Sequence, residues 1–305
     1  MKQKLRHVSP LRYPGGKAPM APWLADIFAQ QLSALPLEVW VEPFAGGAGA
    51  GLTMLNSDAV DELWIIDANP AIAAFWTAVK DDGESLARLI EKTTPDMPLF
   101  EWARQVAAEP ERADVFDLGY AAFILNRCSR SGIIAPNVGP IGGKNQSGDW
   151  TVNSRFNAAE LAERIRNISG MASRLRVTHG DGIAHVEDLV GSGIEDEVML
   201  FVDPPYIREG NRLYTNGLDE AGHQRLADAL NGAPDALWML TYDDEAAVPE
   251  RFYPDRRVLA YEIRNTVARQ RIAEEFAVFS DALDVGRHPL PLARKQSHWV
   301  RELAA

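Results

Sequence analysis

Short apolar runs alternate with polar, helix-like segments along the chain. Residues 39–41, 63–67, 198–202 and 236–241 have the length and composition of buried β-strands. Residues 220–230, between the last two runs, have the spacing of an amphipathic helix. Strands that alternate with helices in this way are typical of an α/β fold.

A glycine-rich segment follows the first of these runs. Residues 45–51 read Ala-Gly-Gly-Ala-Gly-Ala-Gly, and the second run ends on Asp67. Glycines allow the backbone to approach a ligand closely, and an acid about 20 residues further on can accept hydrogen bonds from ribose hydroxyls. The spacing is not a regular G-x-G-x-x-G. The pattern therefore favours a cofactor that contains a nucleoside, with a plain turn as the alternative.

Asp203, Pro204, Pro205 and Tyr206 follow the third run directly. Proline fixes φ and restricts the residue before it, so Asp203 and the Pro204 carbonyl can be held as rigid acceptors beside an aromatic ring. Two fixed acceptors and a ring suit a planar group with an amino substituent, such as the edge of a nucleobase. The alternative is a strand that ends in a proline-rich turn.

Composition narrows the class of protein. A chain of 305 residues predicts two lobes, or one large α/β domain with an insertion. The formal net charge of -12 argues against indiscriminate binding to polyanions, and the single cysteine excludes a disulfide framework or a cysteine-rich zinc site. Because we find no signal segment and no membrane-spanning apolar stretch, we expect a cytoplasmic protein.

The charge changes sign in the middle of the chain. Residues 81–117 are acidic and helical in pattern, whereas residues 126–176 are mainly basic. Within the basic part, residues 131–150 are rich in Gly, Pro, Asn and Ser, which predicts an exposed hairpin or loop. A long polar loop of this kind is more often functional than not.

Five short motifs occur along the chain. They are Tyr-Pro-Gly-Gly-Lys at 13–17, Glu-Pro-Phe-Ala-Gly-Gly at 42–47, Ile-Asp-Ala-Asn-Pro at 66–70, Leu-Asn-Arg at 125–127 and Asp-Pro-Pro-Tyr at 203–206. In identity and order, the five resemble the motifs of the Dam-like DNA adenine methyltransferases, which use S-adenosylmethionine. The resemblance extends over about residues 11–281.

The resemblance implies a Rossmann-like methyltransferase fold, with a seven-stranded, mostly parallel sheet and an inserted, mainly helical target-recognition domain that carries a hairpin or loop. We expect the catalytic domain at residues 1–75 and 171–285, the insertion at 76–170 and a peripheral C-terminal tail at 286–305. The implied cofactor is S-adenosyl-L-methionine, and the implied partner is double-stranded DNA, with no metal and no membrane. We therefore expect the protein to be associated with the nucleoid when it is bound to DNA. The sequence leaves the oligomeric state open and is compatible with a monomer.

The resemblance also implies a role for each matched residue. Asp203, Pro204 and Tyr206 would be catalytic. The cofactor site would comprise Tyr13, Lys17, Phe44, Ala45, Gly46, Gly47, Asp67, Asp181 and Asp203, although Asp181 is nearly as well explained as a turn residue. The candidate DNA contacts are Arg127, Arg130, Lys144, Asn145 and Arg155, each with a solvated or scaffold role as the alternative.

The implied reaction moves a methyl group to the 6-amino group of an adenine. Hydrogen bonds from that group to Asp203 and to the Pro204 carbonyl would free its lone pair, and a base flipped out of the duplex would stack on Tyr206. The alternatives are an amino-directed cytosine methyltransferase, since the same motif can serve both bases, and an NAD-dependent oxidoreductase. Ala135 stands where Dam-type hairpins commonly have the arginine that reads guanine, so the recognition sequence is open, as is a host, phage or restriction role.

Overall fold

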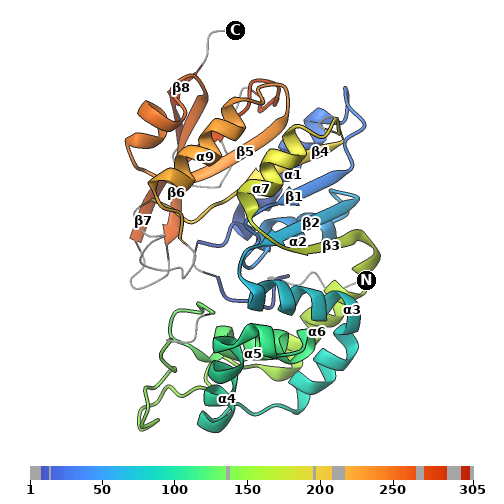
Figure 1. Cartoon of the computed structure of the whole chain (residues 1–305), viewed down its shortest axis with the longest axis vertical. Coiled ribbons are helices and arrows are strands. Elements are labelled where there is room, and N and C mark those ends of the chain that lie inside the picture. Colours follow the sequence, from blue (N-terminus) through green and yellow to red (C-terminus); the bar gives the residue numbers. More distant parts are fainter. Residues whose placement is uncertain are drawn as a thin grey trace.

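The computed structural model describes residues 8–13, 15–134, 138–194, 197–207, 217–265, 271–286 and 297–302. Within these ranges eight strands form one sheet in the order β3-β2-β1-β4-β5-β7-β6-β8 (Figure 1). The strands are β1 (Val39–Glu42), β2 (Glu62–Asp67), β3 (Leu175–His179), β4 (Val198–Val202), β5 (Leu237–Asp243), β6 (Arg257–Asn265), β7 (Arg271–Phe279) and β8 (Ser297–Arg301). The helices are α1 (Ala21–Gln31), α2 (Gly49–Asn56), α3 (Pro70–Lys92), α4 (Met97–Ala108), α5 (Val115–Cys128), α6 (Ala158–Ser169), α7 (Gly182–Val190) and α9 (Glu220–Asn231).

The sheet is parallel over β3, β2, β1, β4 and β5 and antiparallel over β7, β6 and β8. The predicted α/β fold with a mostly parallel sheet is confirmed. The predicted strands at 39–41, 63–67, 198–202 and 236–241 correspond to β1, β2, β4 and β5, and the predicted helix at 220–230 corresponds to α9.

The end of the chain takes part in the sheet. We expected seven strands and a peripheral tail from residue 286 onward, but β8 pairs with β6 and forms the outermost strand. Trp299 packs edge-on against Phe279, and the guanidinium of Arg301 donates to the carbonyls of Pro249 and Tyr253. These contacts hold β8 against the edge of β6, which would otherwise expose unpaired backbone groups.

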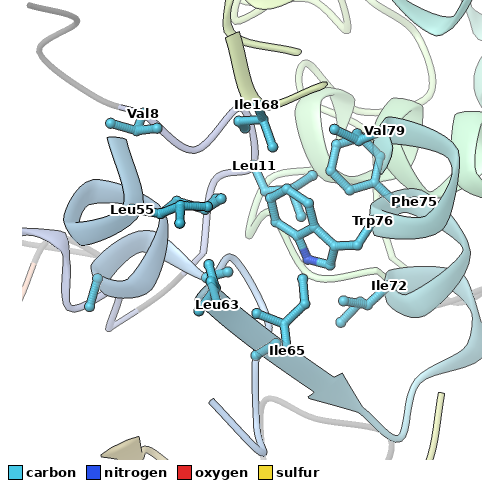
Figure 2. Close-up of a cluster of buried hydrophobic side chains, with 14 of the residues drawn as sticks. Val8, Leu11, Leu55, Leu63, Ile65, Ile72, Phe75, Trp76, Val79 and Ile168 are labelled. Carbon is cyan, nitrogen blue, oxygen red and sulfur yellow. The ribbon is translucent and has the colours of Figure 1, made fainter. Parts of the chain in front are cut away.

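Two hydrophobic clusters cover the two faces of the sheet. Along β1, Trp40 belongs to the cluster that includes α1, α2 and α3, whereas Val41 belongs to the cluster formed with α7 and α9. Alternation of this kind buries both faces, as expected of a parallel sheet. Figure 2 shows part of the first cluster, in which Leu63 and Ile65 of β2 face Ile72 and Trp76 of α3.

The chain between β2 and β3 forms a helical segment, made up of α3, α4, α5, α6 and the loops between them, that lies together beneath the sheet in Figure 1. Its charge pattern has a structural reason: Arg166 of α6 bridges Glu84 and Glu91 of α3, so basic residues late in the segment neutralise acidic residues early in it. Side-chain oxygens of Asn69, Asp96, Asp114 and Asn157 cap its four helices. Within the described part of the chain, no helix is both long and apolar enough to cross a membrane.

Acidic residues gather where the parallel strands end. Glu42, Asp67 and Asp243 are the last residues of β1, β2 and β5, and Asp203 follows β4 directly. Parallel strands present their carboxyl ends at one edge of a sheet, which is where ligands bind in open α/β folds. Antiparallel β7 brings Glu275 to the same edge, opposite Asp243.

Candidate active site

Asp203 and Lys17 form a largely buried ion pair at this edge. Lys17 Nζ lies 2.9 Å from Asp203 Oδ1 and 3.1 Å from Oδ2, and it donates to the Gly15 carbonyl at 2.9 Å. Only 4% of the Lys17 side chain is exposed, against 26% for Asp203. Burial opposes the charge on Lys17, but Asp203 and Glu275 outweigh that effect and raise the pKa of the ammonium. Lys17 is therefore charged at neutral pH.

The two oxygens of Asp203 have different surroundings. Oδ1 accepts from the Thr241 hydroxyl at 2.6 Å and lies 3.1 Å from the Tyr206 hydroxyl, in addition to its contact with Lys17. Among the residues that the structure describes, Oδ2 accepts a hydrogen bond only from Lys17. Oδ2 is thus the oxygen with acceptor capacity left for a ligand.

Tyr206 lies beside this ion pair. Pro204, two residues earlier in the chain, is buried. Lys17 Nζ lies 5.0 Å from the centroid of the Tyr206 ring, close enough for a cation–π contact. The hydroxyl of Tyr206 is within 3.1 Å of Asp203 and 3.0 Å of Glu275. Burial, followed by the two carboxylates, raises the pKa of Tyr206 well above its usual value, so the phenol stays protonated and donates.

Thr241, Tyr261 and Glu275 complete this cluster, and none of them lies in the five motifs described above. Tyr261 donates to Glu275 Oε2 at 2.7 Å, and Lys17 Nζ lies 3.6 Å from the same oxygen. These residues lie on β5, β6 and β7, and the strand register brings them together. The one signal in the sequence is a pair of glutamates, at 274 and 275, inside an otherwise mostly apolar strand.

The glycine loop packs against Tyr13. Gly46 has φ +46°, and a Cβ placed there would lie 2.6 Å from the Tyr13 ring. At Gly47 a Cβ would lie 2.9 Å from Tyr13 Cβ. Two hydrogen bonds fix the loop: the Ala45 N–H donates to a backbone carbonyl of β2, and the Trp76 indole donates to the Gly46 carbonyl at 2.9 Å. Both glycines are therefore needed for the tyrosine to lie on the loop.

Asp67 is tied to the same loop. Its Oδ2 accepts from the Gly46 N–H and its Oδ1 from the Asn69 N–H, both at 2.8 Å. Burial raises the pKa of the Asp67 carboxyl to about 6, against the effect of these two donors, so the group is mainly ionised at neutral pH. Each oxygen keeps a lone pair with which it can accept from a hydroxyl group of a ligand.

A family model for D12 class N6 adenine-specific DNA methyltransferases matches residues 13–111. The matched part contains the motifs of Lys17, Gly46 and Asp67, which supply the contacts just described. This part of the chain is similar to the family of DNA adenine methyltransferases. The match implies a methyl-donor cofactor and a DNA substrate. The cytosine-directed and NAD-dependent alternatives have no support from the match.

Among solved structures, the rRNA methyltransferase aviRa from Streptomyces viridochromogenes is similar to this methyltransferase, with 17% sequence identity and a TM-score of 0.38 over 93% of this chain and 95% of that chain. A TM-score this low does not establish a shared fold. No curated protein sequence matches the chain. The family assignment therefore rests on residues 13–111.

Phe44 and Asp181 of the methyltransferase lie on either side of a close approach between two loops. A Cβ at Gly182 would lie 2.2 Å from the Pro43 carbonyl and 2.9 Å from the Phe44 ring. Asp181 caps α7 through the Ile183 N–H and pairs with Arg225 at 3.0 Å. These contacts account for Asp181 as a structural residue, and its contact with the cofactor stays a prediction.

Glu42 is a further buried carboxyl group near the ion pair. It is 5% exposed, and its Oε1 accepts from the Trp40 indole at 3.1 Å and the Gly51 N–H at 2.6 Å. Burial raises its pKa from the usual 4.5 to about 7 in spite of these donors. The group therefore changes charge near neutral pH.

Glu42→Gln is expected to stabilise the methyltransferase in alkali and not in acid. A carboxyl whose pKa is raised on folding contributes stability below about pH 4.5, and that contribution is lost as the pH rises to about 7. Glutamine does not ionise, so the variant should be more stable than wild type by about 3 kcal/mol at pH 8 and equal to it near pH 4.5. Urea unfolding at the two pH values measures the difference; a difference independent of pH would contradict the raised pKa.

The candidate DNA contacts fall into two groups. Arg127 donates to the carbonyls of Arg155 and Pro10, and Arg130 donates to the Pro140 carbonyl, so both guanidinium groups hold backbone in place. Burial, with Arg12 and Arg164 nearby, lowers the pKa of Arg127 to about 10. Lys144 and Asn145 are exposed on the predicted loop, and Arg155, exposed just after it, lies 5.9 Å from the ring centroid of the exposed Trp150. Ala135 lies outside the described residues.

Asn126 connects the helical segment to the catalytic edge of the sheet. It is fully buried in α5, and its side chain accepts from the Arg12 N–H at 2.7 Å. It also donates to the carbonyls of Arg12 at 2.8 Å and Gly132 at 2.5 Å. Arg12 precedes Tyr13 in sequence, so one amide holds the chain before Tyr13 against the turn that opens the exposed loop.

Proposed function

We propose that the methyltransferase transfers a methyl group from S-adenosylmethionine to the 6-amino group of an adenine in double-stranded DNA. One observation supports this most strongly: Asp203 presents Oδ2 with acceptor capacity at the end of β4, while its other oxygen is fixed by Thr241 and Lys17. Tyr206 provides an aromatic ring next to that oxygen. This arrangement suits an amino group on a planar ring.

The residues at the edge of the sheet fit S-adenosylmethionine. Asp67 offers ionised oxygens to ribose hydroxyls, and the turn from Phe44 to Gly47 would hold the methionine part, with Tyr13 above it. Asp203 and Glu275 face one ammonium, that of Lys17, and their surplus negative charge suits a cationic sulfur. When bound, S-adenosylmethionine supplies an electrophilic methyl group on that sulfur.

The chain's own residues prepare the acceptor. Asp203 Oδ2 and the Pro204 carbonyl would accept the two hydrogens of the amino group, which releases its lone pair from the ring. Lys17 and Thr241 fix the carboxylate before the substrate arrives, so little reorganisation is needed at the moment of reaction. Stacking on Tyr206 would hold the flipped base, and Oδ2 is the nearest acceptor for the proton that the methylated nitrogen releases.

We also propose that residues 76–170 are the target-recognition domain, inserted in a catalytic domain of residues 1–75 and 171–285. Lys144, Asn145 and Arg155 are the candidates for contact with DNA, because they are exposed on or just after the loop that Asn126 anchors beside the site. Since β8 pairs with β6, the 286–305 segment would belong to the catalytic domain in part.

The product identifies the reaction. Unmethylated duplex DNA, incubated with the methyltransferase and S-adenosylmethionine, is expected to yield N6-methyladenine on digestion to nucleosides. Heat-denatured DNA of the same sequence is the matched control and should react far more slowly. N4-methylcytosine as the sole product would contradict the proposal, and equal rates on both DNAs would contradict its duplex substrate.

A further inference from the structure

Glu275 is a buried carboxylate that lies outside all the sequence motifs. It is 6% exposed and stands on β7 opposite Asp243 of β5 and Tyr261 of β6. Its Oε2 lies 2.7 Å from the Tyr261 hydroxyl, 3.0 Å from the Tyr206 hydroxyl and 3.6 Å from Lys17 Nζ. Removing a charge from water costs several kcal/mol, so a carboxylate in this position requires these partners.

Glu275 competes with Asp203 for one proton. The Tyr206 hydroxyl lies 3.0 Å from Glu275 Oε2 and 3.1 Å from Asp203 Oδ1, and a phenol donates to one acceptor at a time. Asp203 Oδ1 already accepts from Thr241 at 2.6 Å and contacts Lys17. Donation to Glu275 therefore fixes the end of the Tyr206 side chain and leaves Asp203 satisfied by its other partners.

Charge gives Glu275 a second effect. In the cluster of Asp203, Glu275 and Lys17, two carboxylates face one ammonium, so one negative charge is uncompensated within it. During methyl transfer the amine lone pair forms the new C–N bond and the electrons of the C–S bond pass to sulfur, so positive charge moves to nitrogen, which then releases a proton. A fixed negative charge near the nitrogen stabilises the transition state more than the neutral amine of the ground state.

We propose that Glu275 is a positioning residue for methyl transfer. It holds the Tyr206 hydroxyl and the Lys17 ammonium in place beside Asp203, and its charge favours the cationic nitrogen. Glu275 does this without touching the amine, which Asp203 binds. The proposal rests on the proposed function.

Glu275→Gln tests this, because it removes the charge and keeps an oxygen acceptor. We expect the single-turnover rate of methyl transfer at saturating DNA and S-adenosylmethionine to fall by about 10- to 100-fold, less than for loss of a direct contact. The dissociation constants for DNA and S-adenosylmethionine, measured by calorimetry, should stay within about threefold of wild type. Glu274→Gln is the matched control, since it makes the same change at the next residue of β7, which is exposed.

Several outcomes would overturn the proposal. They are a Glu275→Gln rate within about twofold of wild type, an equal loss in Glu274→Gln, or weaker binding that accounts for the whole loss. If Glu275→Gln does not fold, Glu275→Asp replaces it; this variant keeps the charge but withdraws it from Tyr206, and an unchanged rate would again contradict the positioning role. A wild-type protein that forms no N6-methyladenine would contradict the proposed function itself, before any variant is compared.

Discussion

Asp203→Ala is expected to lower the rate of methyl transfer by at least about 10²- to 10³-fold, because it removes the acceptor that orients the amino group. The same change removes the main partner of a buried ammonium. Lys17 keeps the Gly15 carbonyl at 2.9 Å and Glu275 at 3.6 Å, so the fold should survive with reduced stability. Rapid-quench single turnover with labelled S-adenosylmethionine measures the rate, and circular dichroism confirms folding.

Two further variants separate charge from shape at this position. Asp203→Asn keeps an oxygen acceptor and loses the charge, so it should retain more activity than Asp203→Ala and far less than wild type. Asp235→Ala is the matched control, because Asp235 is exposed at the opposite end of the neighbouring strand, just before β5. A folded Asp203→Ala protein with full activity would refute the role of this carboxylate.

The strands that carry the site could be predicted because both faces of the sheet are buried. In β1 and β4, neighbouring residues such as Val41 and Trp40, or Leu200 and Met199, pack into opposite clusters, so each strand reads as an uninterrupted apolar run. A polar motif directly after such a run marks the carboxyl edge. For this reason Asp67 and Asp203 were placed correctly at the edge from sequence alone.

Strands β3 and β8 were not predicted, for the opposite reason. Both are outermost in the sheet, and each has several residues that are exposed or only partly buried. Leu175–His179 and Ser297–Arg301 each contain only two apolar residues, too few to read as a buried strand. Pairing with a neighbour, which no local pattern encodes, decides that these residues form strands.

Strand register explains why Glu275 was missed. Asp243, Glu275 and Tyr261 are directly opposite one another on β5, β7 and β6, although they are distant in sequence. A shift of one residue would turn Glu275 to the other face of the sheet. Neither composition nor a short motif carries that information, so the second carboxylate of the site could be found only in the folded structure.

The candidate DNA contacts Arg127 and Arg130 also have roles within the protein. The family resemblance implied contact with DNA, and the structure places their guanidinium groups on backbone carbonyls. Their contacts with DNA stay predictions. In this region the neutral Asn126, from the Leu-Asn-Arg motif, connects the helical segment to the site.

Asn126→Leu is expected to destabilise the methyltransferase and to detach the exposed loop from the site. Leucine has nearly the same shape but leaves the Arg12 N–H, the Arg12 carbonyl and the Gly132 carbonyl without their partner. At about 1 kcal/mol or more for each lost hydrogen bond, the free energy of unfolding should fall by about 3 kcal/mol, and the melting temperature by roughly 6 to 12 °C. Calorimetry measures both quantities.

The matched control for Asn126→Leu is Asn167→Leu, which makes the same substitution at an exposed position of α6 and should leave the melting temperature unchanged. DNA affinity gives a second measurement: below the melting temperature, Asn126→Leu should bind DNA more weakly, because Lys144 and Asn145 lie on the loop that Asn126 anchors through Gly132. Equal stability in the two variants would mean that water replaces the buried amide at little cost. Lower stability with unchanged DNA affinity would mean that the loop holds its position through Arg127 and Arg130, independently of Asn126.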